Sequence, residues 1–147
     1  MMQEPNDLLL KDLCARLPYG VICKDDYAKV EGKLVQIGIN YDMCLLSDDY
    51  GKTELAYIPN CKPYLFPMSS MTEEQKKEIS KRYNYYNPYQ SCVLITDHRQ
   101  GSWDNDDNSC NLQDYLWLID WFNKNHFDYR NLIEKGLAID VTNKNIY

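Results

Sequence analysis

The densest group of oxygen-bearing side chains lies in an acidic segment around residue 105. Asp104, Asp106 and Asn108 match the first three ligand positions of a calcium-binding loop, D-x-D-x-N, and hard cations take oxygen ligands at this spacing. Ser109 stands where that loop needs glycine, and Tyr115 stands where it needs a bidentate glutamate. Since half of the coordination sphere is missing, we interpret the segment as a solvated loop and predict no metal and no other cofactor.

His98 and His126 are the only histidines, and either could act as a general base if folding brought it next to a thiol or a carboxylate. The sequence contains no G-x-S-x-G elbow and no glycine-rich phosphate loop. The adjacent carboxylates at residues 25–26 and 48–49 fit turn chemistry better than paired catalysis. An enzyme whose site is assembled from His98, His126 or the cluster from Asp104 to Asp107 is therefore an alternative hypothesis.

The least ordinary patch is a run of tyrosines beside two cations in the middle of the chain. It comprises Lys81, Arg82, Tyr83, Tyr85, Tyr86 and Tyr89. Aromatic rings interleaved with cations can stack single-stranded bases, and the same residue types are common in protein-binding hot spots. Half-buried packing at the edge of the core is the ordinary explanation, because tyrosine combines an apolar ring with a polar hydroxyl. We take these six residues as the candidate binding site and keep the three interpretations open.

Six cysteines are spread along the chain, and no two are closer than nine positions. They are Cys14, Cys23, Cys44, Cys61, Cys92 and Cys110. Structural zinc sites use close pairs such as C-x-x-C, so this spacing predicts no zinc site. Because the N-terminus carries acids where an export signal has a basic region, we expect a cytoplasmic protein whose thiols stay reduced, most of them in the core.

The charge pattern argues against double-stranded DNA as a partner, and the lengths of the apolar runs argue against a membrane. The net charge is −6, and only residues 72–90 are faintly basic, with four Lys or Arg against three Asp or Glu. Duplex binding depends on neutralising phosphates with cations, so we predict no binding of double-stranded DNA. No apolar run approaches the ~18 residues that a membrane span needs, so we predict no membrane insertion.

The elements that must position these residues follow from periodicity and turn signals. A chain of 147 residues with 44% hydrophobic and 26% charged residues predicts one globular domain. A short helix, capped by Asn6 or Asp7 and ending at Leu17, precedes residues 21–66, where short β-prone runs alternate with turns. This region predicts an antiparallel meander of four or five strands, with Pro63 in an outer strand, and an SH3-like partial barrel if the sheet curls.

Helical patterns dominate the second half of the chain. Thr72 and Gln75 have the spacing of a capping box at a helix start, and Asp128 followed by Gly136 has the form of a short capped helix. The predicted helices cover residues 72–86, 111–125 and 129–135, with a surface loop at 96–110 and a closing strand at 137–141. The sequence therefore predicts an α+β fold, with three to four short helices packed on the meander.

Three further segments stand out as whole sequences: DLCARLPYGV at 12–21, SSMTEEQ at 69–75 and WFNKNHFDYRNLIEKGLA at 121–138. In these segments the chain resembles a group of uncharacterised small proteins encoded in gut Bacteroides genomes and by their phages and prophages. The segments touch both ends and the middle of the chain, so the resemblance covers the whole domain. It implies a protein expressed in the bacterial cytoplasm from a host or prophage locus. The group has no assigned activity and supplies no catalytic residues.

Three function hypotheses of different classes follow. The leading one is a non-enzymatic protein-binding or adaptor module of phage or mobile-element origin. Its partner is a host or phage protein, and its contact surface includes the tyrosine run or a sheet edge. The first alternative is the small enzyme described above, and the second is single-stranded nucleic-acid binding through the tyrosines and their neighbouring cations.

Overall fold

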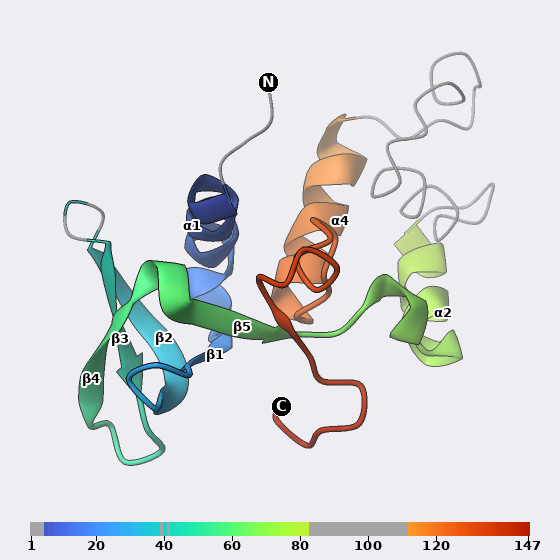
Figure 1. Cartoon of the computed structure of the whole chain (residues 1–147). Helices are drawn as coiled ribbons and strands as arrows, with labels where there is room; N and C mark the ends of the chain where they lie inside the picture. The colour runs from blue at the N-terminus through green and yellow to red at the C-terminus, as the bar shows by residue number, and fades with distance from the viewer. Residues whose placement is uncertain (1–4, 39, 41, 83–111) are drawn as a thin grey trace.

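In a computed structural model, residues 5–38, 40, 42–82 and 112–147 of the chain are described. They form a six-stranded, mostly antiparallel sheet with three α-helices, which confirms the predicted α+β class (Figure 1). The α-helices are α1 (Pro5–Arg16), α2 (Glu73–Arg82) and α4 (Leu112–Lys124). The strands are β1 (Ile22–Asp25), β2 (Val30–Gly38), β3 (Met43–Ser47), β4 (Thr53–Tyr57), β5 (Cys61–Leu65) and β6 (Ile139–Asp140). Short 3-10 helices are η1 (Leu17–Tyr19), η3 (Ile58–Asn60) and η4 (Met68–Ser70).

The strands lie in the order β4-β3-β2-β1-β5-β6. Strands β1 to β4 pair consecutively and antiparallel, as the alternation of β-prone runs and turns predicted. Strand β5 returns to pair with β1, and β6 adds to β5 in parallel. In the part of the chain that the structure describes, no strand pairing joins β4 to the opposite edge, so the sheet is open and no closed barrel forms.

Aspartate side chains form the turns between the strands. After β1, Asp25 Oδ1 accepts hydrogen bonds from the N–H groups two and three residues further on. Between β3 and β4, Asp48 Oδ1 accepts from the N–H groups two and four residues further on. The turn interpretation of the acids at 25–26 and 48–49 is therefore confirmed for the first acid of each pair.

The sheet differs from the expectation at its β6 edge. Strand β5, which contains Pro63, is an internal strand rather than the predicted outer one, because β6 lies beyond it. Among the described residues β6 pairs only with Tyr64 and Leu65. Pro63, which has no N–H to donate, is therefore not required to form a hydrogen bond with β6. The closing strand predicted over 137–141 is accordingly only two residues long.

Two helix starts illustrate how local chemistry sets the boundaries. Helix α1 begins at Pro5, before the predicted caps Asn6 and Asp7, because the fixed φ of proline suits the first helical turn. Helix α2 begins at Glu73, directly after Thr72, and the predicted capping box is confirmed. The Thr72 N–H donates to Gln75 Oε1 at 2.9 Å, and the Gln75 N–H donates to Thr72 Oγ1 at 3.2 Å. Helix α4 falls within the predicted range 111–125.

The helix predicted over residues 129–135 is wrong, since this segment forms turns. Asp128 does act as a cap, accepting hydrogen bonds from the Leu132 and Ile133 N–H groups at 2.8 and 2.9 Å. However, Asn131 has φ +60°, in the left-handed region, which interrupts a right-handed helix. Gly136 also adopts the left-handed conformation predicted for it, with φ +74°.

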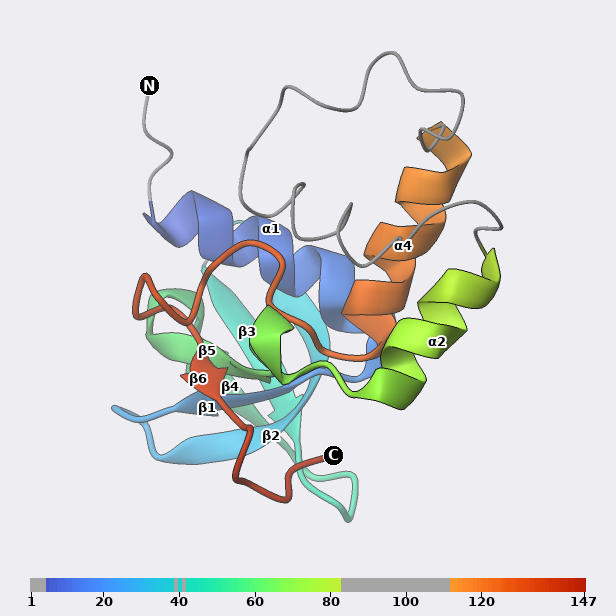
Figure 2. The same ribbon diagram turned by 90° about the vertical axis from the view of Figure 1, so that its right-hand side faces the viewer.

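Two hydrophobic cores sit side by side beneath the surface. The first lies between α1 and the sheet, and the second is formed by residues of α2 and α4 together with Phe127. In the second core, Trp121 and Phe127 stack with ring centroids 5.6 Å apart. Figure 2 shows α1 lying across the sheet, with α2 and α4 to one side of it. None of the helices in the described ranges has both the length and the apolar character for spanning a membrane.

Candidate functional site

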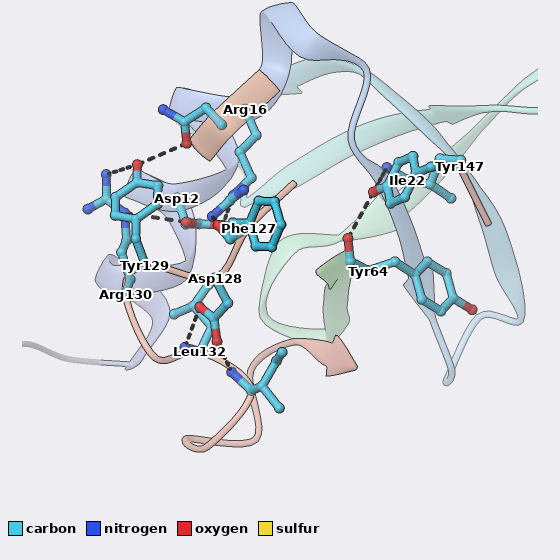
Figure 3. A network of polar contacts seen from close by, with 12 residues as sticks. Asp12, Arg16, Ile22, Tyr64, Phe127, Asp128, Tyr129, Arg130, Leu132 and Tyr147 are labelled. Carbon is cyan, nitrogen blue, oxygen red and sulfur yellow. Dashed lines mark hydrogen bonds and ion pairs between the residues drawn. The ribbon is translucent and has the colours of Figure 1, made fainter. Parts of the chain in front are cut away.

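A buried polar network joins α1 to the segment after α4 (Figure 3). Asp12 and Arg16 lie one helical turn apart, and both are 0% exposed. Arg16 Nε donates to Asp12 Oδ2 at 2.8 Å, and Arg16 Nη2 donates to the Phe127 carbonyl oxygen at 2.6 Å. Because opposite charges and a carbonyl meet inside the protein, the cost of burying the guanidinium is offset. This network connects the two hydrophobic cores.

Tyr129 and Arg130 extend the network towards solvent. Arg130 Nε lies 3.3 Å from Asp12 Oδ1, and the guanidinium carbons of Arg16 and Arg130 lie 5.3 and 5.1 Å from the centroid of the Tyr129 ring. The Tyr129 hydroxyl donates to Asn123 Oδ1 at 2.9 Å. Arg16 Nη1 is buried without a hydrogen-bond partner, but the other groups contact one another, and we therefore interpret the network as structural.

His126 packs against the C-terminal residue rather than in an open site. Its ring stacks on Tyr147 with centroids 3.7 Å apart and planes 10° apart. Burial, together with the charge of Arg16, lowers the pKa of His126 to about 4. Figure 3 shows how Tyr147 is fixed: its hydroxyl donates to the Tyr64 carbonyl at 2.8 Å and accepts from the Ile22 N–H at 2.9 Å. A neutral, stacked histidine supports the packing interpretation.

The buried thiols have no catalytic arrangement either. Cys23, Cys44 and Cys61 are buried, as predicted, while Cys14 is exposed. The Sγ atoms of Cys44 and Cys61 lie 3.8 Å apart, and this contact and burial raise the pKa of Cys44 far above its usual range. Protonated thiols are poor nucleophiles and poor metal ligands. Among the described residues, no group of three His, Cys, Asp or Glu side chains is arranged to hold a metal ion.

A cavity of about 590 Å³ opens between the first three strands and the C-terminal tail. Its lining includes Glu31, Lys33, Asp48 and Asp49, all exposed. Its lining residues in the described part of the chain include neither a histidine nor a thiol, and Asp48 is already engaged in the turn between β3 and β4. Of the groups named in the enzyme hypothesis only His126 lies in the described part of the chain, and it is not among the lining residues of this cavity.

The outer edge of β4 presents backbone groups that pair with no strand in the described ranges. The chain leading out of β3 is bonded to the start of β4, because the Asp48 N–H donates to the Lys52 carbonyl at 2.9 Å. At the other end, the Ile58 N–H donates to the Asp42 carbonyl at 2.8 Å. Successive residues of a strand direct their N–H and C=O groups to opposite sides. The backbone N–H and C=O groups of Glu54 and Ala56, the even-numbered residues between Lys52 and Ile58, therefore also face β3.

The backbone N–H and C=O groups of the odd-numbered residues of β4 must then point away from β3. Tyr57 confirms this alternation, because its N–H donates at 3.2 Å to Asp25 Oδ2, a side chain outside the β3–β4 pair. Thr53 and Leu55 share that direction, and no hydrogen bond engages their N–H groups in the described structure. Strand β4 is the first strand of the sheet order, so these groups form an open edge. We call the outward backbone of Thr53 and Leu55 the β4 edge.

Apolar side chains lie next to the β4 edge, on the outer face of the sheet. Leu55 is 61% exposed and Tyr57 is 44% exposed. Their register partners on β3 are Leu45 and Met43, which are only half-buried. Together these four residues form what we call the outer apolar face. An open edge flanked by exposed apolar side chains has the features of a strand-binding site.

The structure tests few of the site residues predicted from the sequence. Lys81 and Arg82 are the last residues of α2, but their side chains, like the four tyrosines of the run, lie outside the described part. His98, the cluster from Asp104 to Asp107, and two of the cysteines also lie outside it. The β4 edge was anticipated only as an unspecified sheet edge.

Comparisons with protein-family models, curated proteins and solved structures found no match. The functional argument therefore depends on the geometry of the chain itself.

Proposed function

We propose that the protein is a non-enzymatic binding module that takes up an extended segment of a partner protein along the β4 edge. The observation that carries the proposal is the outward direction of the Thr53 and Leu55 backbone. An added strand would gain hydrogen bonds from these groups, and its side chains would pack on the outer apolar face. The resemblance to phage and host proteins implies that the partner is a host or phage protein acting in the cytoplasm.

The composition of β4 favours pairing. Proteins commonly protect an open edge with lysine, proline or an inward-pointing charge. The charged residues here are Lys52 and Glu54, and their side chains approach each other to 3.9 Å. The remaining positions of the strand include threonine, leucine and tyrosine, which suit an extended, half-buried surface. Glu54 is a charge on the inner face and protects the edge at its own position, whereas Thr53 and Leu55, whose backbone groups face outward, carry no such protection.

The path of the strands supports an SH3-like curl as part of this proposal. A four-stranded meander, one turn of 3-10 helix at η3 and a fifth strand beside the first would bring the two ends of such a sheet towards each other. The bond from the Tyr57 N–H to Asp25 links the end of β4 to the end of β1 through a side chain. A partial barrel of this kind would hold the β4 edge in a fixed, twisted geometry.

The decisive variant is Leu55→Pro. Proline has no N–H, and at this position the N–H faces outward, so the change removes a partner bond without removing a bond to β3. Peptides selected from a random library on the full chain should lose about tenfold or more in affinity for the variant, because one hydrogen bond is lost and the ring obstructs the edge. Isothermal titration calorimetry measures the change.

Leu55→Thr is the matched control, because it keeps the N–H and the extended conformation. Circular dichroism verifies that each variant is folded, and Thr53→Pro replaces Leu55→Pro if that variant unfolds. Selected peptides that bind the proline variant as tightly as the wild-type chain would overturn the proposed function.

A further inference from the structure

The surroundings of the β4 edge are acidic. The segment from Asp42 to Tyr57 contains four carboxylates and one lysine, a net charge of −3. The carboxylates are Asp42, Asp48, Asp49 and Glu54, all exposed. The single lysine, Lys52, directly precedes β4 and is already paired, with its Nζ 3.9 Å from Glu54 Oε1. Half of the net charge of the whole chain, −6, therefore belongs to the β3–β4 hairpin.

The register places two kinds of side chain opposite an added strand. Leu55 projects on the outer face with Tyr57, and Glu54 projects on the other face together with Ala56. In an antiparallel addition, directly opposed side chains have Cβ atoms about 4.5–5.5 Å apart. The residue opposite Leu55 therefore meets an apolar surface, whereas the residue opposite Glu54 meets a carboxylate.

We infer that the β4 edge selects an extended segment in which apolar residues alternate with lysine or arginine. This inference rests on the proposed function and names the chemistry of its partner. The apolar residues pack beside Leu55 and Tyr57, and the intervening cations face Glu54 and the acidic ends of the hairpin. Opposite charges across an interface raise the association rate and exclude partners of the wrong sign.

A second copy of the chain fits the same edge poorly. Pairing β4 with itself about Leu55 would place Ala56 of the second copy opposite Glu54, so the second copy would present no cation to this carboxylate. It would also bring together two hairpins that each have a net charge of −3. Because like charges on facing surfaces oppose association, charge complementarity favours a basic segment over a second copy.

The test compares three nine-residue peptides on the full chain: valine alternating with lysine, with glutamate, and with serine. At low salt the valine–lysine peptide should bind about tenfold or more tightly than the valine–glutamate peptide, and added salt should reduce the difference. Glu54→Lys should diminish this preference. Glu74→Lys, an equal charge change at an exposed position of α2, should leave it unchanged.

The outcomes separate the two proposals. The inference is supported if Leu55→Pro loses binding of the valine–lysine peptide, and if the preference for this peptide over the valine–glutamate peptide is reduced by Glu54→Lys but not by Glu74→Lys. Equal binding of the three peptides, abolished by Leu55→Pro, overturns the charge selectivity and leaves the proposed function standing. Binding that Leu55→Pro does not affect, or no binding at all, overturns both. A dimer seen by light scattering and abolished by Leu55→Pro overturns the basic partner in favour of a second copy.

Discussion

Arg16 is a fully buried cation with one carboxylate and one carbonyl oxygen as partners. Its bond to the Phe127 carbonyl joins residues 111 positions apart, so a single side chain links the core under the sheet to the core between α2 and α4. A buried charge that loses its partner costs more than the pair contributes. At the scale of single residues, the stability of the fold should therefore be most sensitive along α1.

Arg16→Met should destabilise the protein by about 3–5 kcal/mol, because the Phe127 carbonyl loses its donor and buried Asp12 keeps only Arg130 as a cation. Urea unfolding followed by circular dichroism measures the free energy. Lys11→Met, an exposed lysine on the same helix, is the control and should change it by less than about 0.5 kcal/mol. Equal effects of the two substitutions would contradict the structural role of the network.

His126 should make stability depend on pH. Its folded pKa of about 4 lies below the ordinary value of 6.5, so protons bind the unfolded state more tightly. The stabilisation is complete above pH 6.5 and is lost as the pH falls towards 4, with a slope of at most about 1.4 kcal/mol per pH unit. His126→Asn removes this contribution and tolerates the observed φ of +64°. Identical pH profiles of the unfolding free energy for both proteins would refute the assignment.

At the scale of elements, the close approach of β2 and β3 depends on Gly32. A Cβ atom at this position would lie 2.4 Å from the Ser47 carbonyl oxygen, which belongs to backbone and cannot rotate away. At Gly38, near the other end of β2, the nearest atom would be 3.4 Å away, an ordinary contact. Substitution at Gly38 is therefore a matched control for substitution at Gly32 in the same strand.

Gly32→Ala should cost about 1–3 kcal/mol, because the added methyl group forces the two strands apart. Gly38→Ala should be nearly neutral. Thermal unfolding of both variants provides the measurement, and a Gly32→Ala protein as stable as the wild type would mean that β2 and β3 are not in the register described.

The features predictable from the sequence are those whose partners are close in the chain. The capping box of Thr72 and Gln75 and the turn at Asp48 need only neighbouring backbone groups. Asp128 is a good cap and predicts a helix over residues 129–135, but Asn131, a residue type enriched in the left-handed region, interrupts it, and the type alone does not show which conformation it adopts. The bond from Arg16 to the Phe127 carbonyl could not be predicted from the sequence either, because the two residues lie far apart in the chain and a backbone carbonyl has no sequence signature.

The β4 edge shows the same limit for function. The sequence predicted a strand there, but the direction in which Leu55 presents its N–H depends on the pairing with β3 and on the position of β4 in the sheet order. The acidic character of the hairpin, by contrast, is already present in the sequence. The charge of a surface can thus be read before folding, whereas its hydrogen-bonding edge cannot.

At the scale of the whole molecule, helices α2 and α4 and the β4 edge lie on different parts of the fold. Figure 1 shows β4 at the far side of the sheet from α2 and α4. A partner strand on β4 would therefore extend the sheet without displacing either helix. In the part of the chain that the structure describes, the molecule is a helix-supported sheet whose β4 edge is open.

Amide hydrogen exchange at β4, measured by NMR with and without the valine–lysine peptide, tests this account most directly. In the free protein the Leu55 and Thr53 amides should exchange quickly, and the Ala56 and Glu54 amides, which face β3, slowly. Saturating peptide should slow exchange at Leu55 and Thr53 while leaving Ala56 little changed. Slow exchange of Leu55 in the free protein, or protection elsewhere with Leu55 unaffected, would contradict the open edge as the binding site.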